Sequence, residues 1–214
     1  MSAKDLSLIY VWDAYCGWCY GFSKIIRTVH ENHREIPLKV ISGGLFVGNR
    51  IQPIQQYPHI PEANKRISQL TGVEFGEAYD GLLQEGTFVM DSDAAAVGFA
   101  ALRSLSPERA VYLASAMQHA FYHEGRSLSD PSTYQEIAWN QGLDGNEMLH
   151  RLDDPAIHAE ARADYIKAGQ LGAKSFPTLL VQTESEIIQL GIGSATLHGI
   201  EKQLTEVMAR IESY

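Results

Sequence analysis

Several features that mark particular classes of protein are scarce or missing in this 214-residue chain. Two cysteines are too few for a disulfide-rich scaffold or a four-cysteine zinc site. No apolar run approaches the length of a membrane span, so we expect no membrane partner. Lys and Arg number 17 against 26 Asp and Glu, and the resulting net charge of -9 disfavours a nucleic-acid partner. The first residues lack the apolar core of a secretory signal, which predicts a cytoplasmic protein.

The remaining composition is that of an ordinary folded protein. Apolar residues make up 45% of the chain and charged residues 20%, which excludes a disordered or fibrous protein. At this length the chain can bury a core of ordinary size as one folding unit, with or without an insertion.

The two cysteines form a Cys-Gly-Trp-Cys motif at residues 16–19, directly after a strand-like run of branched and aromatic residues at 6–12. Such a dithiol, in a chain with no other thiol, indicates disulfide chemistry. From Cys16 to about residue 33 the pattern is helical, so Cys16 lies at the helix start and Cys19 faces the core. The apolar face of that helix consists of Cys19, Phe22, Ile26 and Val29.

The rest of the chain predicts an α/β layer interrupted by helices. Residues 38–42 form a second strand, which makes a right-handed parallel strand–helix–strand unit. Residues 177–182 and 187–190 predict a hairpin, and a last helix follows with Ser194 as its N-cap. Between these parts, residues 61–171 are divided into helices by capping side chains that precede prolines. These pairs are Ser106-Pro107, Asp130-Pro131 and Asp154-Pro155.

The spacing of the dithiol predicts how it reacts. Side chains three positions apart in a helix lie close enough for their sulfurs to bond. We expect Cys16 to be the exposed sulfur, and the unpaired N–H groups at the helix start favour its thiolate. Cys16 would then attack a substrate disulfide, and Cys19 would resolve the mixed disulfide. Whether the protein acts as a reductant or an oxidant stays open at this point.

The order of these motifs resembles the thioredoxin superfamily, in particular the cytosolic branch of the DsbA-like oxidoreductases that includes FrnE-type proteins. The resemblance rests on the dithiol, on the joint at residues 124–130 between inserted helices, and on Ser-Phe-Pro-Thr at 175–178. It covers nearly the whole chain and implies a thioredoxin-like fold interrupted by an inserted all-helical subdomain. The implied division is a discontinuous thioredoxin-like domain at 1–60 and 155–214, and an inserted helical subdomain at 61–154.

The resemblance also implies a substrate-binding site. Pro177 is expected to have a cis peptide bond, to face the dithiol and to lie beside backbone that pairs with an extended peptide. Trp18 and Phe176 are the other candidate substrate-binding residues. The implied partners are protein or peptide thiols and disulfides, with glutathione or a thioredoxin system for recycling and no bound cofactor. Thioredoxin and DsbA carry a buried acid six residues before the first cysteine, whereas this chain has Tyr10 there, which leaves the acceptor of the Cys19 proton open.

Other functions remain open on the sequence alone. The cysteines could form half of a zinc site, and His119 and His123 stand four apart on a predicted helix, although we interpret these histidines as a polar helix face. A redox-sensing adaptor on the same scaffold is a second alternative. A glutathione-dependent isomerase or transferase is a third, but those enzymes typically carry serine where this chain has Cys16.

Overall fold

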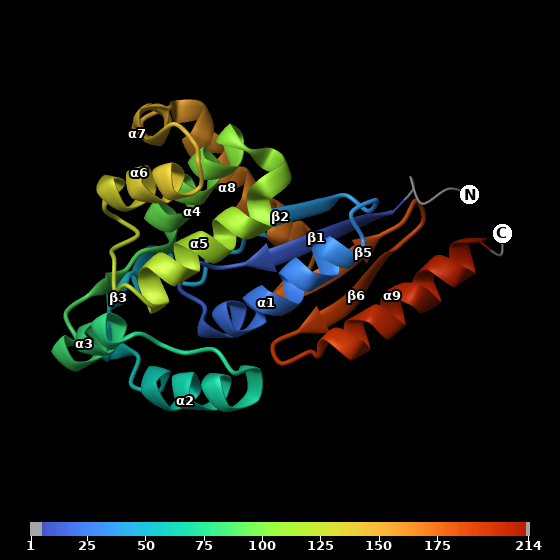
Figure 1. Ribbon diagram of the computed structural model, residues 1–214, viewed down its shortest axis with the longest axis horizontal. Helices are drawn as coiled ribbons and strands as arrows, with labels where there is room; N and C mark the ends of the chain where they lie inside the picture. Colours follow the sequence, from blue (N-terminus) through green and yellow to red (C-terminus); the bar gives the residue numbers. More distant parts are fainter. Residues whose placement is uncertain (1–5, 213–214) are drawn as a thin grey trace.

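The computed structural model describes residues 6–212, which form a four-stranded sheet beside a group of helices (Figure 1). The strands are β1 (Ser7–Trp12), β2 (Leu38–Ser42), β5 (Thr178–Gln182) and β6 (Ile187–Ile192), and helix α1 (Gly17–Asn32) connects β1 to β2. Strands β1 and β2 are parallel, as predicted, and the antiparallel hairpin of β5 and β6 pairs with β1 through β5. The order β2-β1-β5-β6 therefore joins strands from the first and the last quarter of the sequence in one sheet.

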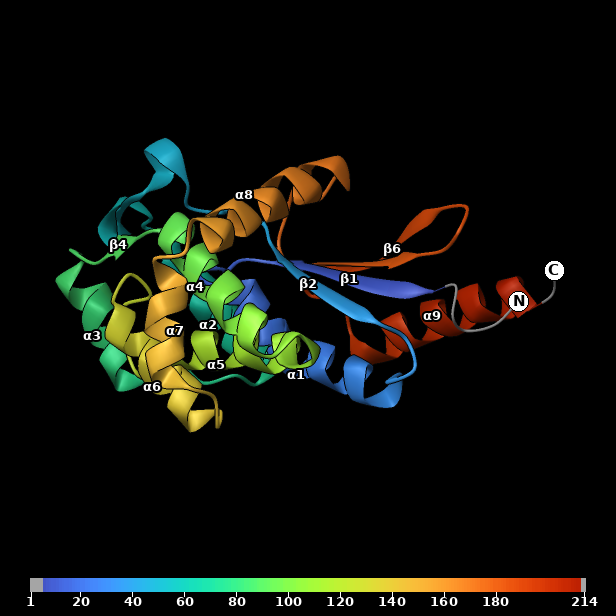
Figure 2. The same cartoon turned by 90° about the horizontal axis from the view of Figure 1, so that it is seen from above.

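Helices cover both faces of this sheet (Figure 2). Helices α1 and α9 (Leu197–Glu212) lie on one face, and α8 (Pro155–Gln170) lies on the other. Side chains alternate along β1, so Tyr10 and Trp12 enter the large core that contains α1, while Ile9 enters a smaller core against α8. Both cysteines belong to the large core.

Helices α2 to α7 gather at one end of the sheet, on the left of Figure 1, which confirms the predicted helical insertion. Their bounds are Ile60–Thr71 (α2), Glu77–Glu85 (α3), Ser92–Leu105 (α4), Ala110–Tyr122 (α5), Pro131–Asn140 (α6) and Gly145–Leu152 (α7). The all-helical description is wrong in one detail, because strand β4 (Val89–Met90) pairs with β3 (Gln52–Pro53). Two-residue strands are too short to show an alternating pattern. The domain boundaries given above remain predictions.

Helix starts follow the predicted capping rules at most positions. Asp130 and Asp154 accept hydrogen bonds of 2.8 Å from the N–H groups of Ser132 and Ala156, as their Asp-Pro pairs predict. Ser106 instead bonds to the carboxylate two residues later, and the turn that it begins is a short 3-10 helix. Among residues 6–212, none of the helices is both long enough and apolar enough to cross a bilayer.

The predicted N-cap of the last helix is wrong. Thr196 caps α9, because the N–H of Gly199 donates to Thr196 Oγ1 at 3.2 Å. Ser194 lies in the turn that follows β6. Strand β6 extends two residues beyond its predicted end, to Ile192, and this displaces the turn and the helix start towards the C-terminus.

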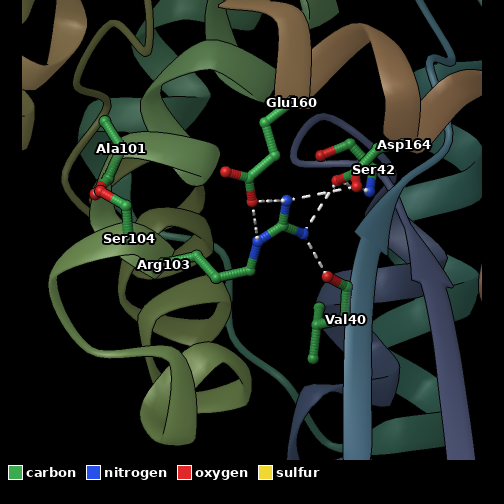
Figure 3. Close-up of polar contacts among 7 residues, drawn as sticks. All are labelled: Val40, Ser42, Ala101, Arg103, Ser104, Glu160 and Asp164. Atoms are coloured by element: carbon green, nitrogen blue, oxygen red, sulfur yellow. Dashed lines mark hydrogen bonds and ion pairs between the residues drawn. The ribbon is translucent and has the colours of Figure 1, made fainter. Parts of the chain in front are cut away.

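A buried ion pair fastens the inserted helices to the sheet (Figure 3). Arg103 of α4 donates to Asp164 of α8 at 2.9 Å and to the carbonyl oxygen of Val40 in β2 at 2.5 Å. Glu160 accepts a further bond from Arg103 at 2.6 Å, and Asp164 also accepts from the N–H of Ser42 at 2.9 Å. The guanidinium therefore joins α4, α8 and β2 at the end of β2 that leads into the dithiol site.

Candidate active site

The dithiol lies where β1 delivers the chain to the start of α1. Cys16 precedes the first helical residue in an extended conformation, with φ -87° and ψ 108°, and its side chain makes no capping hydrogen bond. Its carbonyl oxygen accepts the N–H groups of Cys19 at 2.9 Å and Tyr20 at 3.1 Å, which starts the helix. Cys19 is fully buried in the first turn, so its predicted orientation is confirmed. The two sulfurs do not form a disulfide in this structure.

The prediction that Cys16 is exposed is wrong. Only 6% of Cys16 is accessible, although Cys19, at 0%, is buried more completely. Leu45 in the loop after β2 and Ile60 of α2 help to enclose the space in front of Cys16, leaving a hollow of about 130 Å³. Trp18 is half-buried and lines the same hollow. The first sulfur therefore sits at the wall of a small, largely apolar hollow rather than on an open surface.

The loop before β5 faces Cys16 directly. Cys16 Sγ donates a hydrogen bond of 3.3 Å to the carbonyl oxygen of Phe176. The Phe176–Pro177 peptide bond is cis, so this prediction is confirmed. Pro177 is buried, and its carbonyl oxygen accepts the N–H of Gly193 at 3.3 Å. The structure thus brings together Cys16 and the predicted pair Phe176 and Pro177, 160 residues later in the chain.

Burial controls the ionisation of the second cysteine, Cys19. It raises the pKa of the Cys19 thiol well above its ordinary value, and the adjacent Cys16 thiol raises this pKa further. A thiol in such surroundings stays protonated in the reduced protein. It becomes a nucleophile only when a nearby group stabilises its thiolate or when the pH rises.

Asp13 organises the segments around the dithiol. Its carboxylate accepts the N–H of Tyr15 at 3.0 Å, the N–H of Leu45 at 2.7 Å and the hydroxyl of Ser92 at 3.1 Å. Burial raises the pKa of Asp13, and these three hydrogen bonds act in the opposite direction. Since both carboxylate oxygens are occupied, Asp13 holds the β1–α1 turn to the loop after β2.

The histidines considered as metal ligands form a different arrangement. The rings of His119 and His123 stack with their centroids 4.7 Å apart, and His119 Nδ1 lies 3.3 Å from the carboxylate of Glu124. Within residues 6–212, no group of three or more His, Cys, Asp or Glu side chains is placed to hold a metal ion. The joint at residues 124–130 contains Leu128, which is fully buried and packs in the large core.

Comparison with known proteins identifies the family. A family model of the DSBA-like thioredoxin domain matches residues 7–205. The chain belongs to the DSBA-like thioredoxin domain family. This match spans both halves of the sheet and the inserted helices, and it confirms the predicted thioredoxin-like fold with a helical insertion. A comparison with curated proteins gave no match.

Several solved structures have the same fold. The chain is similar to the cytosolic disulfide reductase DsbM from Pseudomonas aeruginosa, with 25% identity, a TM-score of 0.81, and coverage of 95% of this chain and 99% of that one. The DsbM structure with GSH has 26% identity, a TM-score of 0.78, and coverage of 94% and 99%. A Nitrosomonas europaea protein has 18% identity, a TM-score of 0.84, and coverage of 96% and 98%, which shows a shared fold.

The sequence does not predict the roles of Gly43 and Ser92 in this DSBA-like site. Gly43 belongs to a pair that reads as an ordinary turn, yet a Cβ atom there would lie 2.0 Å from the ring of Phe176. Ser92 looks like part of an ordinary helix start, yet its hydroxyl donates to the carboxylate of Asp13 in the turn after β1. No local pattern marks either role, because each depends on a contact between distant segments. The hydrogen bond between the buried side chains of Asp13 and Ser92 is apparent only in the folded structure.

Proposed function

We propose that this DSBA-like protein is a thiol–disulfide oxidoreductase that exchanges disulfides with protein or peptide substrates, with Cys16 as the attacking and Cys19 as the resolving thiol. The observation that carries the proposal is the position of Cys16. Its sulfur lies at the start of α1, contacts the Phe176 carbonyl oxygen at 3.3 Å and has the buried Cys19 one turn further along the helix.

The exchange takes two steps. The Cys16 thiolate attacks one sulfur of a substrate disulfide, which forms a Cys16–substrate disulfide and releases the other substrate sulfur as a thiolate. Cys19 then loses its proton and attacks the Cys16 sulfur, which closes the Cys16–Cys19 disulfide and releases the second substrate thiol. The protein is oxidised by two electrons and the substrate is reduced by two. A dithiol donor must then reduce the Cys16–Cys19 disulfide before the next cycle.

The surroundings of Cys16 favour an extended peptide as substrate. The carbonyl oxygen of Phe176 lies beside the attacking sulfur and can accept a substrate N–H once Cys16 has entered a mixed disulfide. The adjacent hollow of about 130 Å³ is lined mostly by apolar side chains, among them Trp18, Leu45 and Ile60. We therefore propose that a substrate places an apolar side chain next to its disulfide, against Trp18, while its backbone lies along Phe176 and Pro177.

The comparisons favour the reducing direction. DsbM, which is 25% identical over almost the full length of both chains, is a cytosolic disulfide reductase, and it has been solved with GSH. We propose that this protein likewise reduces disulfides in the cytoplasm, as part of the FrnE-type branch, and that glutathione recycles its dithiol. A thioredoxin system is the alternative recycling partner.

The test is reduction of a peptide disulfide that carries an apolar residue beside one cysteine, measured with glutathione as the electron donor. The wild type should turn over and Cys16→Ser should be inactive. Cys19→Ser, mixed with the peptide before glutathione is added, should stop after one mixed disulfide. Ser115→Ala in α5 provides a control, because the Ser115 hydroxyl donates to the carbonyl oxygen of Val111 within its own helix. Full activity in Cys16→Ser contradicts the proposal. Binding of the peptide without exchange by the wild type indicates an adaptor instead.

A further inference from the structure

Tyr10 lies beneath the dithiol in the centre of the molecule. It is on β1, only 2% of it is accessible, and it shares the large core with both cysteines. Its ring stacks on Phe22 of α1, with centroids 5.9 Å apart and an interplanar angle of 29°. Phe22 follows Cys19 by three positions on the same buried face of α1. The Tyr10 ring therefore lies against the face of α1 that carries Cys19.

Within the described part of the chain, the buried Tyr10 hydroxyl has no hydrogen-bond partner of standard geometry, and the group that it approaches is the Cys19 thiol. Buried hydroxyls without a partner are rare, because desolvation is not compensated. Burial raises the pKa of Tyr10, and the charged forms of Cys19 and then Cys16 raise it further. The hydroxyl therefore keeps its proton at neutral pH, and the thiols are close enough to act on it.

The other titratable groups around Cys19 do not offer the same donor. Cys16 is the group that Cys19 attacks. The Asp13 carboxylate, in the turn after β1, accepts three hydrogen bonds and donates none, while burial raises the pKa of Cys19 and the backbone N–H of Asp13 lowers it. Tyr122 of α5 is buried, and burial and then charge on either cysteine raise its pKa, but its ring stacks on Tyr20 and lines the hollow in front of Cys16.

We propose that the Tyr10 hydroxyl donates a hydrogen bond to the Cys19 sulfur while this sulfur carries negative charge, and so promotes the resolving step. The inference rests on the proposed function. In that step Cys19 loses its proton, its sulfur bonds to Cys16 Sγ, and the bond between Cys16 and the substrate sulfur breaks. The proton ends on the departing substrate thiolate, directly or through solvent. Tyr10 neither gains nor loses a proton, because it acts only as a donor to the transient thiolate.

The experiment compares reduced wild type with Tyr10→Phe, which keeps the ring and its stacking on Phe22. Each protein is mixed rapidly with oxidised glutathione, and the two thiol-release steps are followed from mildly acidic to alkaline pH. We expect the first step to be unchanged and the second to be about tenfold slower in Tyr10→Phe at neutral pH, with its pH profile moved to higher pH. Tyr134→Phe is the matched control, since the Tyr134 hydroxyl bonds to the carbonyl oxygen of Leu128.

The outcomes separate this inference from the proposed function. If the wild type releases no thiol, the proposed function fails and the role of Tyr10 fails with it. If the wild type completes both steps and Tyr10→Phe has the same pH profile, only the role of Tyr10 is overturned. A crystal structure of Cys16→Ala at alkaline pH tests the contact even if Tyr10→Phe does not fold. Tyr10 Oη within hydrogen-bond distance of Cys19 Sγ supports the inference, and a hydroxyl turned away overturns it.

Discussion

Replacing Gly43 by alanine should disturb the wall that faces Cys16 without touching either cysteine. Gly43 follows β2, and its N–H donates to the carbonyl oxygen of Trp12 at 2.7 Å, which fixes its backbone to β1. A Cβ atom at Gly43 would lie 2.0 Å and 2.2 Å from two ring carbons of Phe176. Ordinary contacts begin at 3.4 Å, so the ring must move by more than an ångström. The Phe176 carbonyl oxygen would move with it.

The size of the effect follows from this overlap. Forcing an extra carbon into a packed site costs about 1–3 kcal/mol of unfolding free energy. For a chain of this length, that corresponds to a fall in melting temperature of about 2–4 °C for each kcal/mol. A displacement of about an ångström beside a reacting atom slows a reaction by up to about a hundredfold. We therefore expect Gly43→Ala to lower the exchange rate by more than its loss of stability explains.

The assay is peptide disulfide reduction together with thermal unfolding. Gly81→Ala in α3 is the matched control, because nothing lies within 4 Å of a Cβ atom at that position. In a helix interior this change should raise stability by about 0.5–1 kcal/mol and leave exchange unchanged. Wild-type exchange and an unchanged melting temperature in Gly43→Ala refute the reasoning.

Three further predictions concern the ion pair, the thiols and the carboxylate. Arg103→Ala leaves the buried Asp164 carboxylate without its cation and should cost about 3–5 kcal/mol in denaturant unfolding, and a loss below about 1 kcal/mol contradicts this. Alkylation of the reduced protein should modify Cys16 before Cys19, because Cys19 is fully buried and burial raises its pKa. Peptide mass analysis checks the order of labelling, and equal labelling of the two cysteines at neutral pH would contradict the prediction. Raising the pH should increase the labelling of Cys19, because a larger fraction of this thiol ionises. Asp13→Asn places an amide NH2 group opposite one of the three groups that donate to Asp13, so one hydrogen bond is lost. We expect the free energy of unfolding to fall by about 1–3 kcal/mol in thermal unfolding. Unchanged stability would mean that these hydrogen bonds contribute little.

The parts of the fold that could be predicted are those with local patterns. The run before the dithiol, the apolar face of α1 and the hairpin near the C-terminus each show a clear periodicity, and the structure has all three. Asp130 and Asp154 could be predicted as caps because the prolines after them fix the first helical residues. The start of α9 could not, because β6 extends to Ile192, which leaves the predicted cap Ser194 in a turn and makes Thr196 the cap of the helix.

The parts of the site that could not be predicted depend on distant contacts. Cys16 is buried because the loop after β2 and helix α2 close in front of it, and no pattern near residue 16 shows this. The roles of Gly43 and Asp13 depend on Phe176 and Ser92, which are far away in sequence. Tyr10 could be recognised as a departure from related proteins, but the position of its buried hydroxyl near Cys19 is a property of the packed core.

Trapping of the mixed disulfide tests the central claim most directly. Reduced Cys19→Ser should react with oxidised glutathione to give one glutathione adduct, which peptide mass analysis should place on Cys16. Reduced Cys16→Ser should form no adduct on the same timescale, because the remaining thiol is fully buried. An adduct on Cys19 in Cys16→Ser, formed as fast as that on Cys16 in Cys19→Ser, or no adduct in either variant, would contradict the account.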